Sequence, residues 1–303
     1  MQVRASAIAS RARSAPSHLL RAYRYSLGRR FRLDFARVYW NSRLQGEHEA
    51  LVRDIVRDAA GRGAERARTR GVVVADAMAG VGPFAVPLTS ALAPHYRDVR
   101  VVCHANDLNP ASYEYLRTNA RLNRCFADRL QAYNLDARQF IHKMNEEGAA
   151  VDHFIMNLPQ LAPEFLDAFR GWRFRDGRGG EASDGNARGP TVHVHCFGEK
   201  ARAPEEAARA ERQVRRRCAA ALGVDPACLS RNEFRLRVVR DVGPRKNMFR
   251  ASFRLPVEVG GVGRRGPATR EGGKAVLDVS AEDKKGDNVQ AAAPPLSKRS
   301  RVD

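Results

Sequence analysis

The 303-residue sequence predicts an α/β fold of the Rossmann-like kind, built on a seven-stranded, mostly parallel sheet. Three observations favour this fold class. Short apolar runs alternate with segments of helical periodicity through the middle of the chain, which is typical of repeated strand, helix and strand units. A glycine turn follows the first apolar run, and the last two runs indicate a closing pair of antiparallel strands.

The strands are expected at residues 72–75, 99–105, 130–135, 151–156, 191–197, 233–239 and 249–255. The run at 191–197 alternates apolar and polar residues, as a half-buried strand does. Helices are expected from near Pro83, at 110–122 and at 204–221, the last with a strongly basic face. We interpret residues 71–256 as one domain. Its segment 171–190 is rich in Gly and Arg and lacks periodicity, which indicates a surface insertion.

The two ends of the chain have a different composition. Residues 31–70 are interpreted as a short bridge into the domain, with an amphipathic helix over 47–58. Residues 1–30 are interpreted as a basic arm, because eight arginines and no acidic residue occur up to Leu33. This composition fits a mitochondrial transit peptide or a disordered arm that lies on RNA. Residues 257–303 are polar and basic, and we expect a disordered tail that serves as a nuclear address or an RNA contact.

The overall composition limits the classes of function. A formal net charge of +19 attracts polyanions, so nucleic acid is the expected partner, with a merely solvated basic surface as the alternative. No run of about 18 apolar residues occurs, so no membrane association is expected. The five cysteines show no C-x-x-C spacing, which argues against a zinc site or a disulfide framework and indicates a reducing compartment. No metal is expected.

The strongest motif runs from Asp76 to Phe84 (DAMAGVGPF), between the first strand and the first helix. Gly80 and Gly82 let the backbone turn tightly and approach a ligand closely. The third glycine of the dinucleotide fingerprint is missing and Pro83 follows directly, so a nucleoside without a pyrophosphate fits better than NAD. The motif therefore predicts a site for S-adenosylmethionine.

Polar side chains follow the next three strands. Asp107 comes where such folds place the acceptor for ribose hydroxyls. Asp136 can accept a hydrogen bond from an adenine amino group while Ala137 offers its backbone, and Asn157 follows the fourth strand. For both carboxylates the alternative is a helix N-cap. Because the carboxyl ends of successive strands converge, one crevice is expected to collect these groups.

With these residues assembled, the chain resembles the archaeal and eukaryotic tRNA guanine-N1 methyltransferases, which act at position 37, next to the anticodon. The resemblance runs from about Phe31 to Pro256. It is carried by VYWNSRL at 38–44, Glu47-His48, the glycine turn, NDLNP at 106–110, NLP at 157–159, Ala162 with FLDAF at 165–169, VHVHCF at 192–197, VRDV at 239–242 and MFRASF at 248–253.

The resemblance implies a class I methyltransferase that uses S-adenosylmethionine and acts on tRNA. It implies cofactor contacts from His48, Asp107, Leu108, Asp136, Ala137 and Asn157, to which the turn adds Asp76, Gly80 and Gly82. Family members carry an N-terminal domain that recognises the outer corner of tRNA, and nothing similar precedes Phe31. We therefore expect a fragment, a truncated product or a member without that module.

Methylating N1 of guanine requires loss of its proton while negative charge develops on O6. Arg43 is the residue expected to stabilise that charge, by resemblance and because a fixed guanidinium can orient the base; a phosphate contact is the alternative. Asn157 is expected to face the flipped-out base, and Pro159 to stiffen the loop on which it stacks. Glu47, four residues from Arg43, is the predicted general base, with Glu164 as the competitor.

Two other functions stay open. A sister enzyme class of the wybutosine pathway transfers the aminocarboxypropyl group of the same cofactor, although the NLP and NSRL segments favour methyl transfer. A non-catalytic tRNA-binding remnant is the second. We expect a monomer, located in the mitochondrial matrix, nucleus or cytoplasm.

Overall fold

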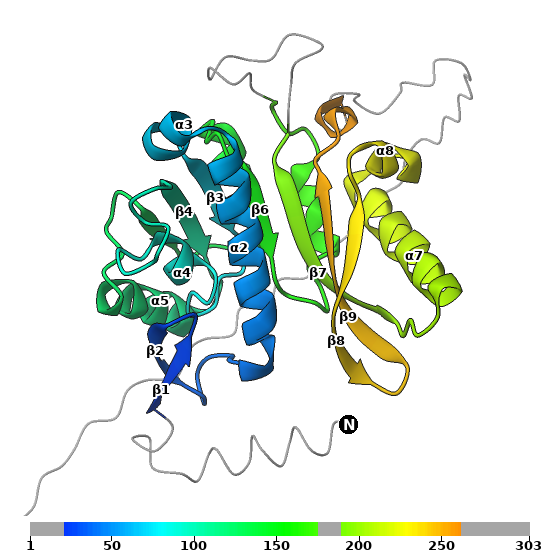
Figure 1. Cartoon of the computed structure of the whole chain (residues 1–303). Coiled ribbons are helices and arrows are strands. Elements are labelled where there is room, and N and C mark those ends of the chain that lie inside the picture. Colours follow the sequence, from blue (N-terminus) through cyan, green and yellow to red (C-terminus); the bar gives the residue numbers. More distant parts are fainter. Residues whose placement is uncertain (1–20, 175–188, 262–303) are drawn as a thin grey trace, which may run out of the picture. The chain divides into compact units, whose positions relative to one another are not determined.

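A computed structural model of the chain describes residues 21–174 and 189–261 (Figure 1). The predictions for residues 1–20, for the middle of the insertion and for nearly all of the tail lie outside the described residues. The predicted fold class is confirmed. Seven strands form one sheet in the order β5-β4-β3-β6-β7-β9-β8. Neighbouring strands from β5 to β7 are parallel, and β9 pairs antiparallel with both β7 and β8.

All seven predicted strands are present, with shifted ends. Their bounds are β3 Val72–Asp76, β4 Val101–Asn106, β5 Leu130–Tyr133, β6 His153–Met156, β7 Thr191–Glu199, β8 Arg235–Gly243 and β9 Lys246–Arg254. The closing hairpin is longer than expected, because β8 and β9 continue to a turn at residues 244–245.

The helices are α2 Gln45–Gly61, α3 Ala64–Thr69, α4 Ala85–Thr89, α5 Pro110–Leu122, α6 Ala137–Glu146, α7 Pro204–Leu222 and α8 Pro226–Arg231. The described residues also contain three 3₁₀ turns, η2 Ser42–Leu44, η3 Glu164–Phe169 and η4 Val257–Gly261. The helix expected after Pro83 has only five residues, and α6 was not predicted. Within the described part of the chain, no helix is both long and apolar enough to cross a membrane.

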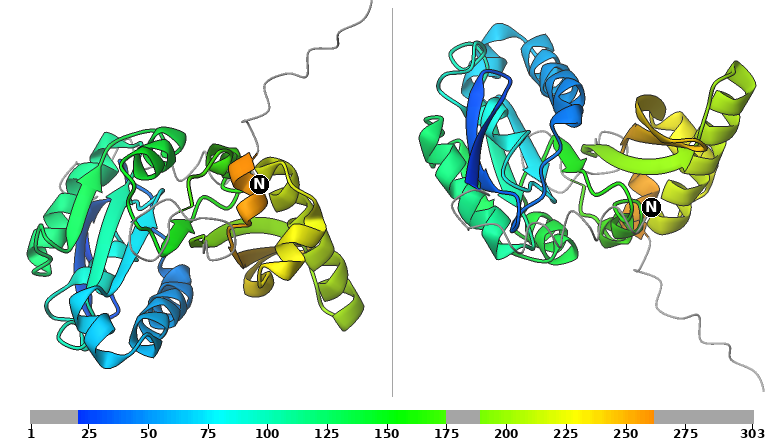
Figure 2. Two further views of the ribbon diagram at one scale, coloured as in Figure 1. Left: turned by 90° about the horizontal axis from the view of Figure 1, so that it is seen from above. Right: turned by 90° about the horizontal axis from the view of Figure 1, so that it is seen from below.

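The sheet carries a hydrophobic cluster on each face. Along β6, Phe154 and Met156 belong to one cluster and Ile155 to the other, because successive side chains of a strand point to opposite faces. The first cluster packs against α6, η3 and α7, and the second against α2, α4 and α5 (Figure 2). Helices on both faces of a mostly parallel sheet explain why strands such as β6 are buried at every position.

A two-stranded hairpin precedes this domain and was not predicted. It consists of β1 Arg21–Ser26 and β2 Arg29–Asp34, so the last ten residues of the expected basic arm are strand and turn. Both turn residues have positive φ, Leu27 at 52° and Gly28 at 69°. Leucine is an unusual residue for the first of these positions, which hides the turn from sequence inspection. The side chains of Asn119, on α5, and of Asn123, the C-cap of α5, form hydrogen bonds with the backbone of β2.

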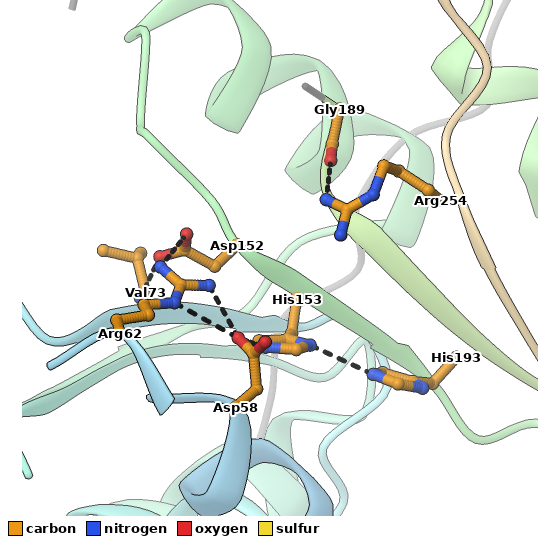
Figure 3. A network of polar contacts seen from close by, with 8 residues as sticks. All are labelled: Asp58, Arg62, Val73, Asp152, His153, Gly189, His193 and Arg254. Carbon is orange, nitrogen blue, oxygen red and sulfur yellow. Dashed lines mark hydrogen bonds and ion pairs between the residues drawn. The ribbon is translucent and has the colours of Figure 1, made fainter. Parts of the chain in front are cut away.

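A network of polar contacts fixes α2 on the sheet (Figure 3). Arg62 forms ion pairs with Asp58, at 2.7 Å, and with Asp152, at 2.6 Å. His153, on β6, lies 3.2 Å from Asp58 and 3.2 Å from the ring of His193, on β7. The hydrogen bond with His153, together with Arg62, holds the pKa of Asp58 below its ordinary value against the effect of burial. The network fixes the orientation of α2, whose first turn carries Glu47 and His48.

Candidate functional site

A cavity of about 670 Å³ lies at the carboxyl edge of the sheet. Residues that follow β3, β4, β5 and β6 line it. The chain runs from β3 outward to β5 and then returns to β6 on the other side of β3, so the strand order reverses between β3 and β6. Open α/β sheets bind ligands at such a reversal. Of the predicted site residues, the lining includes His48, Gly80, Asp107, Leu108, Asp136, Ala137, Asn157 and Pro159. Arg43, Glu47, Asp76 and Gly82 lie outside it.

The two glycines of the turn have different roles. Both have positive φ, 55° at Gly80 and 95° at Gly82. A Cβ on Gly82 would lie 2.7 Å from Cδ1 of Leu116 and 2.9 Å from Val86, so this glycine is required for α4 and α5 to pack. Gly80 faces open space instead, and its backbone N–H donates to Asp107 at 2.8 Å. Only Gly80 is therefore placed for ligand contact.

The N-cap alternative is excluded for Asp107 and correct for Asp136. Asn109 is the N-cap of α5, while Asp107 accepts the N–H groups of Gly80 and Asn109 with its two oxygens. Asp136 caps α6 by accepting the N–H of Arg138 at 2.8 Å. Burial raises the pKa of Asp107, although these backbone donors oppose the shift. Both carboxylates keep lone pairs that a ligand in the cavity can use, since each oxygen can accept more than one hydrogen bond.

Asp76 differs from the other predicted cofactor contacts, because it is fully buried beneath the turn. Complete burial raises the pKa of Asp76 to about 8, and the nearby charge of Asp107 adds to the shift. Its Oδ1 accepts the N–H of Met78 at 3.4 Å, and no partner is found for Oδ2 among the described residues. The residue therefore supports the turn from below rather than lining the cavity.

Asp76→Asn is expected to make stability less dependent on pH. A carboxyl whose pKa is raised in the folded state keeps its proton there while the unfolded chain loses it, so wild-type stability falls as pH rises from the ordinary carboxyl range to about 8. The amide cannot titrate. Urea unfolding of both proteins between pH 5 and pH 9 measures the difference, and parallel curves would show that Asp76 is ionised in the folded protein.

Three residues that line the cavity carry a buried polar atom with no hydrogen-bond partner in the described part of the chain. These atoms are Nε1 of Trp40, Nδ1 of His48 and Oδ1 of Asn157. Burial, and then the neighbouring His195, lowers the pKa of His48 to about 4, so its ring is neutral at physiological pH. Unsatisfied buried polar groups are costly, which favours a polar ligand that pairs with them.

Glu47 lies beside the cavity in a buried ion-pair cluster. Its carboxylate is 3.0 Å from Nε2 of His195 and 3.1 Å from the guanidinium of Arg250, which also binds Asp54 at 2.8 Å. Burial alone would raise the pKa of Glu47, but His195 and Arg250 outweigh it and the pKa is lowered. This environment favours a structural role over proton abstraction, so the general-base role stays a prediction.

Arg43 lies on η2 and is exposed. Asn41, the N-cap of η2, accepts the backbone N–H of Arg43, and both Asn41 and Leu44 line the cavity. Arg43 therefore belongs to a segment that forms part of the cavity wall, although Arg43 itself is not among the lining residues. Glu164, the competing base, lies on η3 and pairs with Arg217 at 2.7 Å.

The sequence reasoning missed the apolar walls and one cation. Tyr39, Phe165, Phe197 and Met248 supply apolar surface, and Arg240, on β8, lies at the cavity as well. Each belongs to a segment that carries the family resemblance, but only the folded chain shows that β8 and β9 reach the carboxyl ends of β3 to β6. An arginine on a strand gives no sequence signal for such a position.

This strand order, together with a nucleoside-sized cavity at the turn after β3, defines a Rossmann-like methyltransferase domain. The TRM5/TYW2 methyltransferase domain model matches residues 24–177, and the chain belongs to this family. The match begins inside the β1–β2 hairpin, so the hairpin is part of the family domain rather than a separate arm.

Relatives from several eukaryotes are similar over most of the chain. The tRNA (guanine(37)-N(1))-methyltransferase 1 of Phaeodactylum tricornutum is 46% identical over 228 residues, which cover 75% of this chain and 45% of the relative. The tRNA (guanine(37)-N(1))-methyltransferase of Saccharomyces cerevisiae is 35% identical over 277 residues, covering 76% and 50%. Among solved structures, Trm5b of Pyrococcus abyssi has a TM-score of 0.52 and 25% identity, covering 79% of this chain and 57% of that one. The chain spans about half the length of these curated relatives.

Proposed function

We propose that this chain transfers the methyl group of S-adenosylmethionine to N1 of guanine 37 in tRNA. The observation that carries the proposal is the cavity, in which unpartnered polar atoms and two carboxylates from successive strand ends meet in a domain of this family. Relatives that bear the name of this activity share up to 46% of the aligned residues. The net charge of +19 suits a polyanionic substrate.

The residues present fit S-adenosylmethionine, which supplies an activated methyl group when bound. Asp107, held by the N–H groups of Gly80 and Asn109, is assigned to accept the ribose hydroxyls. Asp136, at the start of α6, is assigned to accept from the adenine amino group. The apolar residues of the turn that line the cavity would keep water away from the bound cofactor, which would strengthen the electrostatic interactions inside the cavity.

The target base would occupy the part of the cavity near the segment that follows β6. Asn157 offers a buried, unpartnered side-chain oxygen, and Pro159 fixes the backbone next to it. Arg43 approaches from η2 and is assigned to hold charge on O6 as N1 loses its proton. A base of a folded RNA must leave its stack to enter such a cavity.

The test incubates the full chain with S-adenosylmethionine and two tRNA transcripts that differ only by guanine or adenine at position 37. Digestion and mass spectrometry of the nucleosides should show 1-methylguanosine from the first transcript and no product from the second. Aminocarboxypropyl transfer gives a heavier nucleoside, which identifies the sister activity. A chain that binds tRNA but shows no heat of binding with S-adenosylmethionine is the non-catalytic remnant.

Asp107→Ala is expected to weaken S-adenosylmethionine binding by about 1.5 to 3 kcal/mol, the scale of a charge-assisted hydrogen bond left unmade. The Gly80 N–H also loses its acceptor, which loosens the turn. Calorimetry measures the affinity, and tRNA affinity serves as the control because Asp107 is not assigned to RNA. Unchanged cofactor affinity would remove Asp107 from the site.

We further propose that the chain acts as a monomer, which light scattering of the purified protein measures. The compartment stays a proposal with three alternatives, the mitochondrial matrix, the nucleus and the cytoplasm. Fluorescent fusions of residues 1–30 and of residues 257–303 separate a transit peptide from a nuclear address.

A further inference from the structure

A second, open hollow of about 400 Å³ adjoins the cavity. It shares Pro159, Gln160 and Phe197 with the cavity lining. Its other walls are Gly198, Glu199, Arg217, Arg245 and Lys246. We call it the basic hollow. A ligand that leaves the cavity past Pro159 enters it directly.

The charge of the basic hollow is positive. Lys246 lies with its Nζ 4.1 Å from the centroid of the Phe197 ring, and Arg245 is exposed with no side-chain partner among the described residues. Arg217 is paired with Glu164, outside the hollow. The one carboxylate of the lining, Glu199, is paired with Arg209 at 3.3 Å. Two cations, at residues 245 and 246, thus keep charge available for an anion.

The backbone holds these cations in place. The backbones of Glu199 and Lys246 lie opposite each other in the β7–β9 ladder. The N–H of Lys200 donates to the carbonyl of Arg245 at 3.0 Å. An ion pair between Lys200 and Asp241 also joins the end of β7 to β8, the other strand of the hairpin. The N–H of Phe197 donates to the carbonyl of Pro159 at 3.2 Å, which ties the hollow to the loop after β6. An anion would therefore meet cations whose backbone is already ordered, so that binding has to order only their side chains.

We propose that the basic hollow binds a backbone phosphodiester of a nucleotide directly next to the target guanosine. The proposal rests on the proposed function, because it assumes that the target base enters the cavity. The cavity and the basic hollow share the wall of Pro159 and Phe197, so the chain on one side of that base has a direct path into the hollow, where the cations match the charge of a phosphate. Such a contact fixes the position of the substrate without reading its sequence.

The test compares two double variants of the full chain. The hollow variant combines Arg245→Ala and Lys246→Ala, and the control variant combines Arg231→Ala and Arg235→Ala. The control variant also removes two positive charges, from exposed residues in α8 and at the start of β8. Both α8 and the start of β8 lie away from the hairpin turn that carries residue 245 (Figure 1). Binding of an anticodon stem-loop and of S-adenosylmethionine is measured separately, with stem-loops carrying a neutral methylphosphonate on either side of the target guanosine.

We expect the hollow variant to bind the stem-loop roughly 10-fold more weakly than the wild type, with a flatter dependence on salt and unchanged affinity for S-adenosylmethionine. One of the two methylphosphonates should weaken binding to the wild type and to the control variant, but not to the hollow variant, because the contact is already lost.

Two results would overturn the proposal. One is equal RNA affinity of the hollow and control variants. The other is that each methylphosphonate weakens binding to the hollow variant as much as it weakens binding to the wild type. That result would mean that both phosphates bind outside the basic hollow. If the wild-type chain binds the stem-loop but makes no 1-methylguanosine, the proposed function is wrong. That outcome can be told apart from the two results that contradict phosphate binding in the basic hollow.

Discussion

Replacing Arg43 with alanine is expected to slow methyl transfer by roughly 100- to 1,000-fold, or about 2.7 to 4 kcal/mol, while tRNA affinity changes far less. The reason is that charge on O6 develops only as N1 loses its proton, so the guanidinium acts on the transition state rather than on the bound substrate. Arg43 lies on η2 between Asn41 and Leu44, two residues that line the cavity, and its own side chain is exposed beside that wall. Single-turnover transfer at saturating enzyme measures the rate, with tRNA binding measured separately.

Two further variants sharpen this result. Arg43→Lys should recover little activity, since an ammonium cannot present the planar fork of a guanidinium. Arg53→Ala is the matched control, because Arg53 is an exposed arginine of the neighbouring helix that pairs only with Glu49 among the described residues. If Arg43→Ala instead loses affinity and turns over bound tRNA at the wild-type rate, Arg43 is a phosphate contact and the catalytic assignment is wrong.

Replacing Glu47 with alanine is expected to lower the free energy of unfolding by about 3 to 5 kcal/mol, because it leaves the buried guanidinium of Arg250 without one of its two carboxylates. Glu49→Ala is the control on the same helix. Its partner Arg53 is exposed, so that loss should stay within about 1 kcal/mol. Denaturant unfolding of the three proteins measures both values.

The effect of Glu47 on stability should depend on pH. Since the pKa of the carboxyl is lowered in the folded chain, its contribution is complete above the ordinary carboxyl pKa and is lost as pH falls through the folded-state value. A catalytic role makes a different prediction. Glu47→Gln would then keep most of the stability but lose transfer activity at every pH. If the Glu47→Gln variant is less stable but still transfers the methyl group, the role of Glu47 is structural.

Much of the site follows from the sequence because parallel strands end at one edge. Asp107, Asp136 and Asn157 were placed by counting from strand ends, and all three line the cavity. The same reasoning could not tell which residues of the turn face the ligand. Gly80 and Gly82 look alike in sequence, yet only the packing of Leu116 and Val86 shows that Gly82 serves the helices.

Tertiary structure decided the features that depend on residues far apart in the chain. The sequence did not reveal the β1–β2 hairpin, because no favourable turn sequence marks it. Hydrogen bonds from its backbone to Asn119 and Asn123, about ninety residues away, stabilise it instead. Glu47 was chosen as a base by its spacing from Arg43. Its contacts with His195 and Arg250, from β7 and β9, bury it and lower its pKa.

The sequence by itself determined the fold class, the glycine turn and the two carboxylates that line the cavity, because periodicity and strand ends are local properties that the backbone converts directly into position. The tertiary structure decided which charged groups are buried and paired and which cations beside the cavity have no carboxylate partner among the described residues. Those outcomes depend on contacts between distant segments. Desolvation by such contacts shifts the pKa values of Asp76 and His48, whereas His195 and Arg250 lower the pKa of Glu47 against the effect of desolvation.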